Sequence, residues 1–164
     1  MPLAHRLVRR LPTAVCQVFL LIGCSGGSAT DPPLPAGTTT ITFPGATLTA
    51  EIAASTTARE QGLMGRAALG ADKGMLFVYA ADQSPQFVGF YMKDTPIDLS
   101  IAFLDANRTV INVDEMTKNT LITHVAKANF RYAIEANAGW FTLHGVAAGT
   151  TANFALPAGT VISP

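Results

Sequence analysis

Short runs of alternating apolar and polar residues recur along the chain and predict a domain built mainly from β-strands. The clearest alternation is Ile97, Leu99, Ile101 and Phe103, whose period of two indicates a strand with one buried face. Other short stretches rich in β-branched and aromatic residues, bounded by turn residues, indicate further strands. These expected strands span residues 38–43, 47–53, 74–79, 87–93, 109–113, 130–135 and 151–156.

A first short helix is expected after the second strand. Thr57 and Glu60 have the spacing of a capping box, in which a hydroxyl and a carboxylate satisfy the first free backbone amides. The helix should run to about Met64, with Leu63 and Met64 facing inward, and Gly65 suits the position that follows a helix end.

A second short helix is expected over residues 137–145, with Asn137 as its N-cap and Gly145 just past its end. His144 would lie in its last turn, where it complements the helix dipole. Many short strands with two short helices predict a mainly β (α+β) fold. We expect a curled antiparallel sheet or a small β-barrel.

A different pattern occupies the first 23 residues. Three arginines among residues 1–10 precede an apolar run, residues 11–22, which is shorter than the roughly 20 residues that a membrane-spanning helix needs. The run ends in Leu21-Ile22-Gly23-Cys24, which resembles a bacterial lipobox. The resemblance implies a lipoprotein signal peptide over residues 1–23, cleavage before Cys24 and lipidation of that cysteine.

Residues 24–37 then read as a flexible tether, and residues 38–164 as the folded domain. Cys16 lies inside the expected signal peptide, so Cys24 is the one cysteine that remains after cleavage. Ser25 follows it, which in lipoproteins suggests sorting to the outer membrane. We expect an exported protein, anchored by its lipid at the periplasmic face of the outer membrane.

The net charge of the chain argues against a nucleic-acid partner. After residue 23 the chain has eight basic and eleven acidic residues, a formal charge of about −3. No basic footprint for nucleic acid is present, so we expect no nucleic-acid partner. With 49% hydrophobic and 13% charged residues, the chain is expected to fold into a compact domain.

Four blocks of sequence together resemble the domain of unknown function 192 (DUF192) family over residues 50–156. They are Arg-Glu-Gln-Gly-Leu-Met-Gly-Arg at 59–66, Gly-Met-Leu-Phe at 74–77, Phe-Tyr-Met-Lys-Asp-Thr-Pro-Ile-Asp-Leu at 90–99 and Tyr-Ala-Ile-Glu-Ala-Asn-Ala-Gly at 132–139. The resemblance implies a compact β-rich domain, often exported, and implies no activity. The family usually has tryptophan and asparagine where this chain has Tyr91 and Asp94.

The polar residues of the third and fourth blocks are the first candidates for a ligand site. Lys93 lies in an apolar expected strand, and a buried charge needs a partner. We expect its ammonium group within about 4 Å of Glu135 or, as second choice, of Asp98. The alternative to a ligand anchor is a structural ion pair that holds the bend at Pro96.

Three further residues are weaker candidates for ligand binding. Arg59 and Arg66 flank the first helix and could bind an anionic group or a sugar acid, although such residues are more often solvated. Asn137, with Trp140 and Phe141, could line a carbohydrate platform, but packing of the two aromatic rings on the sheet is the simpler interpretation.

The sequence gives weak support for a metal site. Soft thioether ligands such as Met64, Met75, Met92 and Met116 could bind Cu(I), but methionine is also a common core residue. His124 and His144 lack the spacing of a zinc motif. We therefore expect no metal ion, no cofactor and no catalytic residue.

These observations favour a lipid-anchored envelope protein that acts as a non-enzymatic ligand-binding or interaction module. Its partner would be a small molecule or another envelope protein. One alternative is a hydrolase or transferase that acts on envelope glycans through Lys93 with Glu135 or Asp98. A second alternative is a methionine-based copper-handling module.

Overall fold

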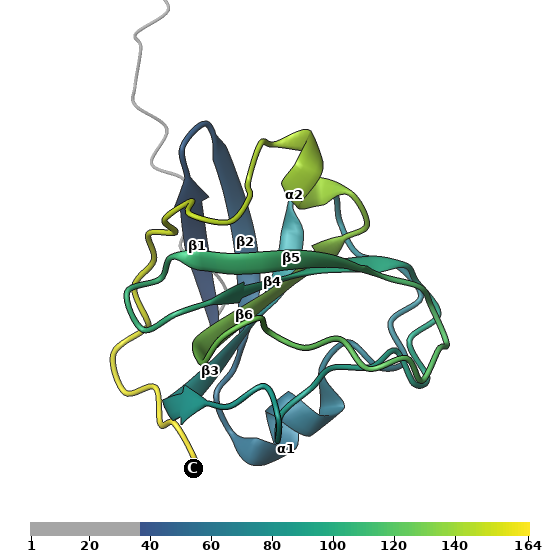
Figure 1. The fold of residues 1–164 in the computed structure, drawn as a ribbon, viewed down its shortest axis with the longest axis horizontal. Helices are drawn as coiled ribbons and strands as arrows, with labels where there is room; N and C mark the ends of the chain where they lie inside the picture. Colours follow the sequence, from purple (N-terminus) through teal and green to yellow (C-terminus); the bar gives the residue numbers. More distant parts are fainter. Residues whose placement is uncertain (1–36) are drawn as a thin grey trace, which may run out of the picture. The chain divides into compact units, whose positions relative to one another are not determined.

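The structure, a computed structural model, describes residues 37–164. The expected signal peptide and almost all of the tether, including Cys24, lie outside the described residues. The described chain forms six strands and two short helices (Figure 1): β1 (Thr38–Phe43), β2 (Ala46–Ala53), α1 (Thr56–Gln61), β3 (Lys73–Gln83), β4 (Leu99–Leu104), β5 (Val110–Met116), β6 (Phe130–Asn137) and α2 (Trp140–Leu143).

The strands form one mixed sheet in the order β1-β2-β3-β6-β4-β5. All neighbouring pairs are antiparallel except β2 and β3, which run parallel. The mainly β fold with two short helices is confirmed. The sheet is not closed, with β1 and β5 at its edges, so the barrel that was one of the two expected forms is not found. Figure 1 shows its strong twist, the β1–β2 hairpin crossing the direction of β5.

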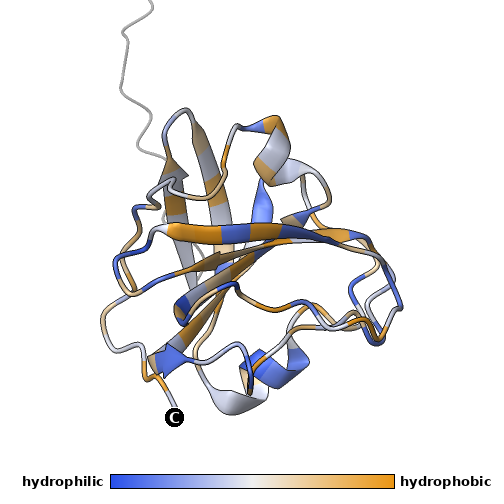
Figure 2. Cartoon of the chain, in the orientation of Figure 1, coloured by the Kyte–Doolittle hydropathy of each residue, from blue (hydrophilic) through white to orange (hydrophobic). Residues whose placement is uncertain are grey.

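The parallel pair follows from the long connection between β2 and β3. Parallel neighbours need a crossover of a dozen or more residues, and residues 54–72, which contain α1, provide it. Ser55, not Thr57, caps the helix, because its side-chain oxygen accepts a hydrogen bond from the Ala58 amide at 3.1 Å. The helix ends at Gln61 rather than near Met64, and most of its residues are polar (Figure 2).

Both faces of the sheet are buried in its centre. All six residues of β4 are buried, so the expectation of one buried face was wrong. Leu99, Ile101 and Phe103 pack in one apolar cluster, which α1 and the segments 84–98 and 117–129 help to cover. Ala102 and Leu104 pack in the other, with α2 and the C-terminal segment. A strand between two such layers cannot show alternation of apolar and polar residues.

Two expected strands do not form. Residues 87–93 form a single isolated β-bridge, between Phe90 and His124. Segments 84–98 and 117–129 therefore lie side by side as loops. Phe90 and Met92 are both buried, and their spacing of two residues is the same as that of buried residues in a strand. Residues 151–156 likewise make only isolated bridges, to Thr109 and Thr42.

The second helix is shorter than expected and begins later. Its N-cap is Gly139, with a φ of 76°, and Asn137 belongs to β6. The Gly139 amide donates to Ser100 Oγ at 2.7 Å and to Glu115 Oε2 at 3.1 Å. Trp140 and Phe141 are buried in the core beside Phe43, so they pack on the sheet and form no exposed platform. None of the helices in residues 37–164 has the length and apolar character to cross a membrane.

Candidate functional site

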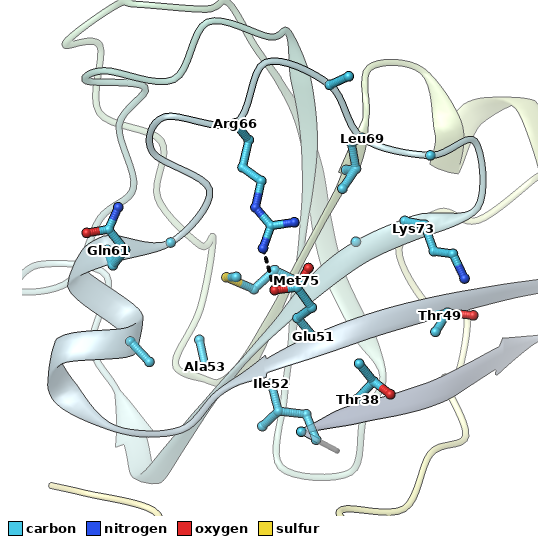
Figure 3. A pocket seen from close by; sticks show the side chains of 16 residues that line it. Thr38, Thr49, Glu51, Ile52, Ala53, Gln61, Arg66, Leu69, Lys73 and Met75 are labelled. Carbon is cyan, nitrogen blue, oxygen red and sulfur yellow. Dashed lines mark hydrogen bonds and ion pairs between the residues drawn. The ribbon is translucent and has the colours of Figure 1, made fainter. Parts of the chain in front are cut away.

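Two cavities lie on the side of the sheet that carries α1. The first has a volume of about 670 Å³. Its walls come from β2, the start of β3, the end of α1 and the loop that leads from α1 to β3 (Figure 3). The second has a volume of about 330 Å³ and lies between α1, β3 and the segment 84–98. Gln61 and Gly62 line both cavities, so the end of α1 lies between them.

An ion pair between Arg66 and Glu51 lies in the first cavity. Arg66 Nη2 donates to Glu51 Oε2, and the two side chains are 38% and 42% exposed. This hydrogen bond is the main cause that raises the pKa of Arg66 above its usual value. Figure 3 shows Arg66 reaching from the loop to Glu51 on β2, with Met75 beside the pair and Lys73 on the far side of the cavity. Arg66, a candidate from the sequence, therefore faces a real cavity.

The loop that walls this cavity is fixed by side chains from elsewhere in the sheet. Asn137 Nδ2 donates to the main-chain oxygens of Leu69, Gly70 and Ala71 at 3.4, 2.8 and 3.3 Å. The Trp140 indole N–H donates to Asp72 Oδ1 at 3.0 Å. Asn137 does not line either cavity, so its observed role is to hold the loop.

Glu135 is the central residue of the second cavity. It lies on β6 opposite Met75 of β3 and Ile101 of β4, and only 6% of it is exposed. Within residues 37–164, its carboxyl group forms no hydrogen bond and no ion pair. No side-chain oxygen of the described chain is both sealed from solvent and without a hydrogen bond. The Glu135 oxygens therefore reach the open space of the cavity, and burial raises the pKa of this carboxyl group to about 8.

A single row of residues connects the two cavities. Glu51, Met75, Glu135 and Ile101 are successive register partners on β2, β3, β6 and β4. Register partners point to the same face of a sheet. Met75, which is 7% exposed, thus separates the ion-paired glutamate of the first cavity from the unpaired glutamate of the second.

Aromatic rings form the walls around Glu135. Phe77 and Phe90 meet edge to face with ring centroids 5.0 Å apart, and Tyr79 lines the cavity beside them. Burial raises the pKa of Tyr79 to about 12; the positive charge of Arg59 opposes this shift and the charge of Glu135 adds to it. Its hydroxyl group is therefore neutral at physiological pH.

Arg59 also lines the second cavity, but its guanidinium group is held by the protein backbone. Nη1 donates to the main-chain oxygens of Ala54 at 2.6 Å and Val78 at 3.1 Å, and Nη2 donates to that of Pro164 at 2.8 Å. The group lies 4.8 Å from the centre of the Tyr79 ring. Arg59 therefore links α1 to the sheet. The sequence had suggested that it could bind an anionic group.

Lys93 does not meet the carboxylates that we expected. It is exposed and forms no ion pair with Glu135 or Asp98, so the predicted contact within 4 Å is wrong. The reason is local: Lys93 lies in a loop, where Met92 and Thr95 are buried and Lys93 points outward. Asp98 is exposed too, and its Oδ1 accepts a hydrogen bond from the Lys118 amide at 2.8 Å.

Asp94 has a φ of 52°. Asparagine and aspartate are the side chains that tolerate this left-handed backbone best after glycine. Its carbonyl oxygen accepts the Gly65 amide at 2.8 Å. The position thus requires a turn residue, and aspartate meets that requirement.

Three methionines are buried in the core, and the two histidines of the described residues contact neighbouring protein groups. Met75, Met92 and Met116 are buried in the apolar cluster around the aromatic rings. His124 Nδ1 lies 3.7 Å from Asp114 Oδ2, and His144 Nδ1 lies 2.8 Å from the Trp140 carbonyl oxygen. Residues 37–164 contain no group of three or more histidine, cysteine, aspartate or glutamate side chains placed to hold a metal ion.

Known structures share this fold. A protein from Sinorhizobium meliloti 1021, provisionally described as a transcription regulator, is 26% identical and superposes with a TM-score of 0.67, covering 75% of this chain and 98% of its own. A protein of unknown function from Novosphingobium aromaticivorans DSM 12444 is 24% identical with a TM-score of 0.63, covering 71% of this chain and 83% of its own. No curated protein matches the chain.

A family model agrees with the sequence blocks described above. The DUF192 model, described as an uncharacterized ACR, matches residues 39–154. The blocks contribute to the two cavities: Gly62 and Arg66 from the first, Met75 from the second, the segment around Phe90 from the third and Glu135 from the fourth. The chain belongs to the DUF192 family.

Proposed function

We propose that this protein is a ligand-binding module of the cell envelope, and that its first cavity binds a small organic anion. The observation that supports this most strongly is the Arg66–Glu51 pair in an open cavity of about 670 Å³. Cavities of roughly 300–1,000 Å³ are typical of small-molecule sites.

Arg66 keeps donor capacity for a ligand. A guanidinium group carries five N–H donors in a planar fork, and Arg66 gives one hydrogen bond to Glu51. Its other N–H groups have no partner within the described residues. The fork matches a carboxylate or a phosphate, which can take two parallel hydrogen bonds. Glu51 holds the arginine in place when the cavity is empty.

The rest of the cavity favours a ligand with both a charged end and a carbon body. Lys73 adds a second positive charge, so the cavity has two cationic side chains against one carboxylate. Leu69, Ile52 and Met75 supply apolar surface. A sugar acid or another small organic acid has this combination of groups. The proposal is a binding function, and the glycan-acting alternative loses support because Lys93 and Asp98 lie outside both cavities.

The description of the Sinorhizobium meliloti relative does not lead us to propose DNA binding. A DNA-binding surface needs an excess of basic residues. This chain has a formal charge of about −3 after residue 23.

Substitution of the two members of the ion pair is expected to affect ligand binding differently. Arg66→Gln should weaken binding of a small sugar acid about 10- to 100-fold, because a hydrogen bond to a charged group is worth about 1.5–3 kcal/mol. Glu51→Gln should leave binding intact or tighten it, since a competing negative charge is removed. Thermal-shift titration with sugar acids, phosphates and neutral sugars measures both effects, because a bound ligand raises the melting temperature by mass action.

Arg131→Gln is the matched control for this experiment. Arg131 forms a similar ion pair with Asp82, at 2.8 Å, but it lines neither cavity. Its variant should bind as the wild type does. Equal binding by the Arg66→Gln protein, or equal stabilisation by neutral sugars, would contradict an anion site.

The envelope location rests on Cys24 and has its own test. We propose that the protein is a lipoprotein anchored through Cys24 at the periplasmic face of the outer membrane. The wild-type protein should partition with membranes and incorporate labelled palmitate, whereas a Cys24→Ser variant should do neither. Palmitate on the Cys24→Ser protein would show that Cys24 is not the lipidation site.

A further inference from the structure

Glu135 occupies a position where an apolar residue would be expected. Its strand neighbours on the same face are Met75 and Ile101, and Ala133 lies two residues before it on β6. Burial of a carboxyl group without a hydrogen-bonding or charged partner is unfavourable. Leucine or methionine would fill the same volume at no such cost. A buried polar group that costs stability and opens into a cavity is a frequent feature of binding sites.

The cavity around this carboxyl group is apolar and rich in aromatic surface. Phe77, Tyr79 and Phe90 present rings to it, and Leu63 and Met92 are buried beside them. The face of an aromatic ring carries partial negative charge and attracts cations. Leu99 of β4 completes the lining on the side of the sheet. The volume, about 330 Å³, suits a small molecule rather than a peptide.

The other titratable groups around the cavity do not neutralise Glu135. α1 contributes Arg59, which the backbone and the Tyr79 ring hold, and Glu60, which is exposed. β3 contributes Tyr79, and the segment 84–98 contributes Tyr91, which is 48% exposed. β4 has no titratable residue. The positive partner that the carboxylate lacks would therefore have to come from a ligand.

We infer that the second cavity binds a small organic cation, an ammonium group on an apolar body, with Glu135 as its counter-ion and the rings of Phe77, Tyr79 and Phe90 as its walls. This site is separate from the anion site of the proposed function, since Met75 lies between Glu51 and Glu135. An ammonium group satisfies the carboxylate by charge and hydrogen bonding together. The apolar body of the ligand replaces water against the rings.

Binding of such a cation should release a proton. Burial keeps Glu135 largely protonated near pH 7 in the empty protein, because its pKa is about 8. An ammonium group favours the ionised carboxylate and expels this proton. The association constant should therefore rise by up to about tenfold for each pH unit between pH 6 and 8, and level off above pH 8. Calorimetry in two buffers of different ionisation enthalpy counts the protons released.

The experiment compares benzylammonium with benzyl alcohol, which has nearly the same shape and no charge. Calorimetric or NMR titration of the purified protein should show binding of benzylammonium at least about tenfold tighter than that of the alcohol. Glu135→Gln should abolish this preference while keeping the volume of the side chain. Glu60→Gln, on the same cavity but exposed, should keep it, and so should Arg66→Gln in the other cavity.

Each possible result bears on the inference. Equal binding of the two probes would show a neutral pocket, and benzylammonium binding that survives Glu135→Gln would show that Glu135 is not its counter-ion. Failure of benzylammonium to bind at millimolar concentration would also overturn the cation site. A thermal melt of Glu135→Gln verifies its folding. Loss of sugar-acid binding in Arg66→Gln, with the benzylammonium preference kept, would concern the anion site alone, whereas loss of the benzylammonium preference in Arg66→Gln would contradict a separate cation site.

Discussion

Phe103→Ala is expected to lower the free energy of unfolding by about 3–5 kcal/mol, the usual cost of removing a large buried aromatic side chain. Phe103 is fully buried in β4. Its ring meets Phe90 and Phe130 with centroids 5.5 and 5.2 Å apart, both edge to face. Phe90 and Phe130 lie on separate elements and cannot both move inward to fill the space, so the cavity term adds to the lost burial.

Urea denaturation of the purified protein measures this change. Phe87→Ala is the matched control, because Phe87 is 86% exposed and its truncation should change stability by less than about 0.5 kcal/mol. A loss below about 1 kcal/mol for Phe103→Ala would mean that this cluster is not a close-packed core.

Each of the six strands of the sheet coincides with a strand expected from the sequence, and the most local of these pairings is the β1–β2 hairpin. β1 and β2 form a hairpin around Pro44 and Gly45, and the Gly45 φ of 82° is what the turn needs. Buried and more exposed residues alternate along β1, which lies at the edge of the sheet. β6 was also located correctly, because a short apolar run bounded by loop residues indicates a buried strand.

The failures concern segments whose conformation depends on distant partners. Phe90 and Met92 point into the core at strand spacing, yet residues 87–93 make only one bridge, to His124. Gly89 approaches Thr123 so closely that a Cβ atom there would clash with Thr123 Cγ2. The apolar pattern records burial, and it does not record whether a neighbouring strand is available for pairing.

The sequence identified two residues of the candidate sites but not the partners of those residues. Arg66 and Glu135 were chosen as polar residues within distinctive blocks, and each lines a cavity. Their surroundings were not predictable, because Glu51 meets Arg66 across the crossover that makes β2 and β3 parallel. Glu135 was assigned Lys93 as a partner on the assumption of a strand that does not form. A charged residue inside β2, at Glu51, was the available signal for the first cavity.

The contribution of Glu135 to the free energy of unfolding should decrease as pH rises from about 5 to 8. Its pKa is about 8 in the folded protein and 4.5 in an ordinary, solvated state. Between these values the folded protein holds a proton that the unfolded chain has released. Stability therefore falls by about 1.4 kcal/mol for each pH unit in this window, and by about 3–5 kcal/mol in total. The contribution is complete below about pH 4.5 and lost above about pH 8.

Glu135→Gln isolates this contribution, because its amide stays neutral at every pH. The difference in unfolding free energy between Glu135→Gln and the wild type should grow in favour of the variant as pH rises from 5 to 8. Glu60→Gln, an exposed glutamate on α1, should show no such trend. Urea denaturation at half-unit pH intervals gives the slope directly. A difference that stays constant over this range would mean that Glu135 is ionised in the folded protein, and that a positive charge or water already compensates it.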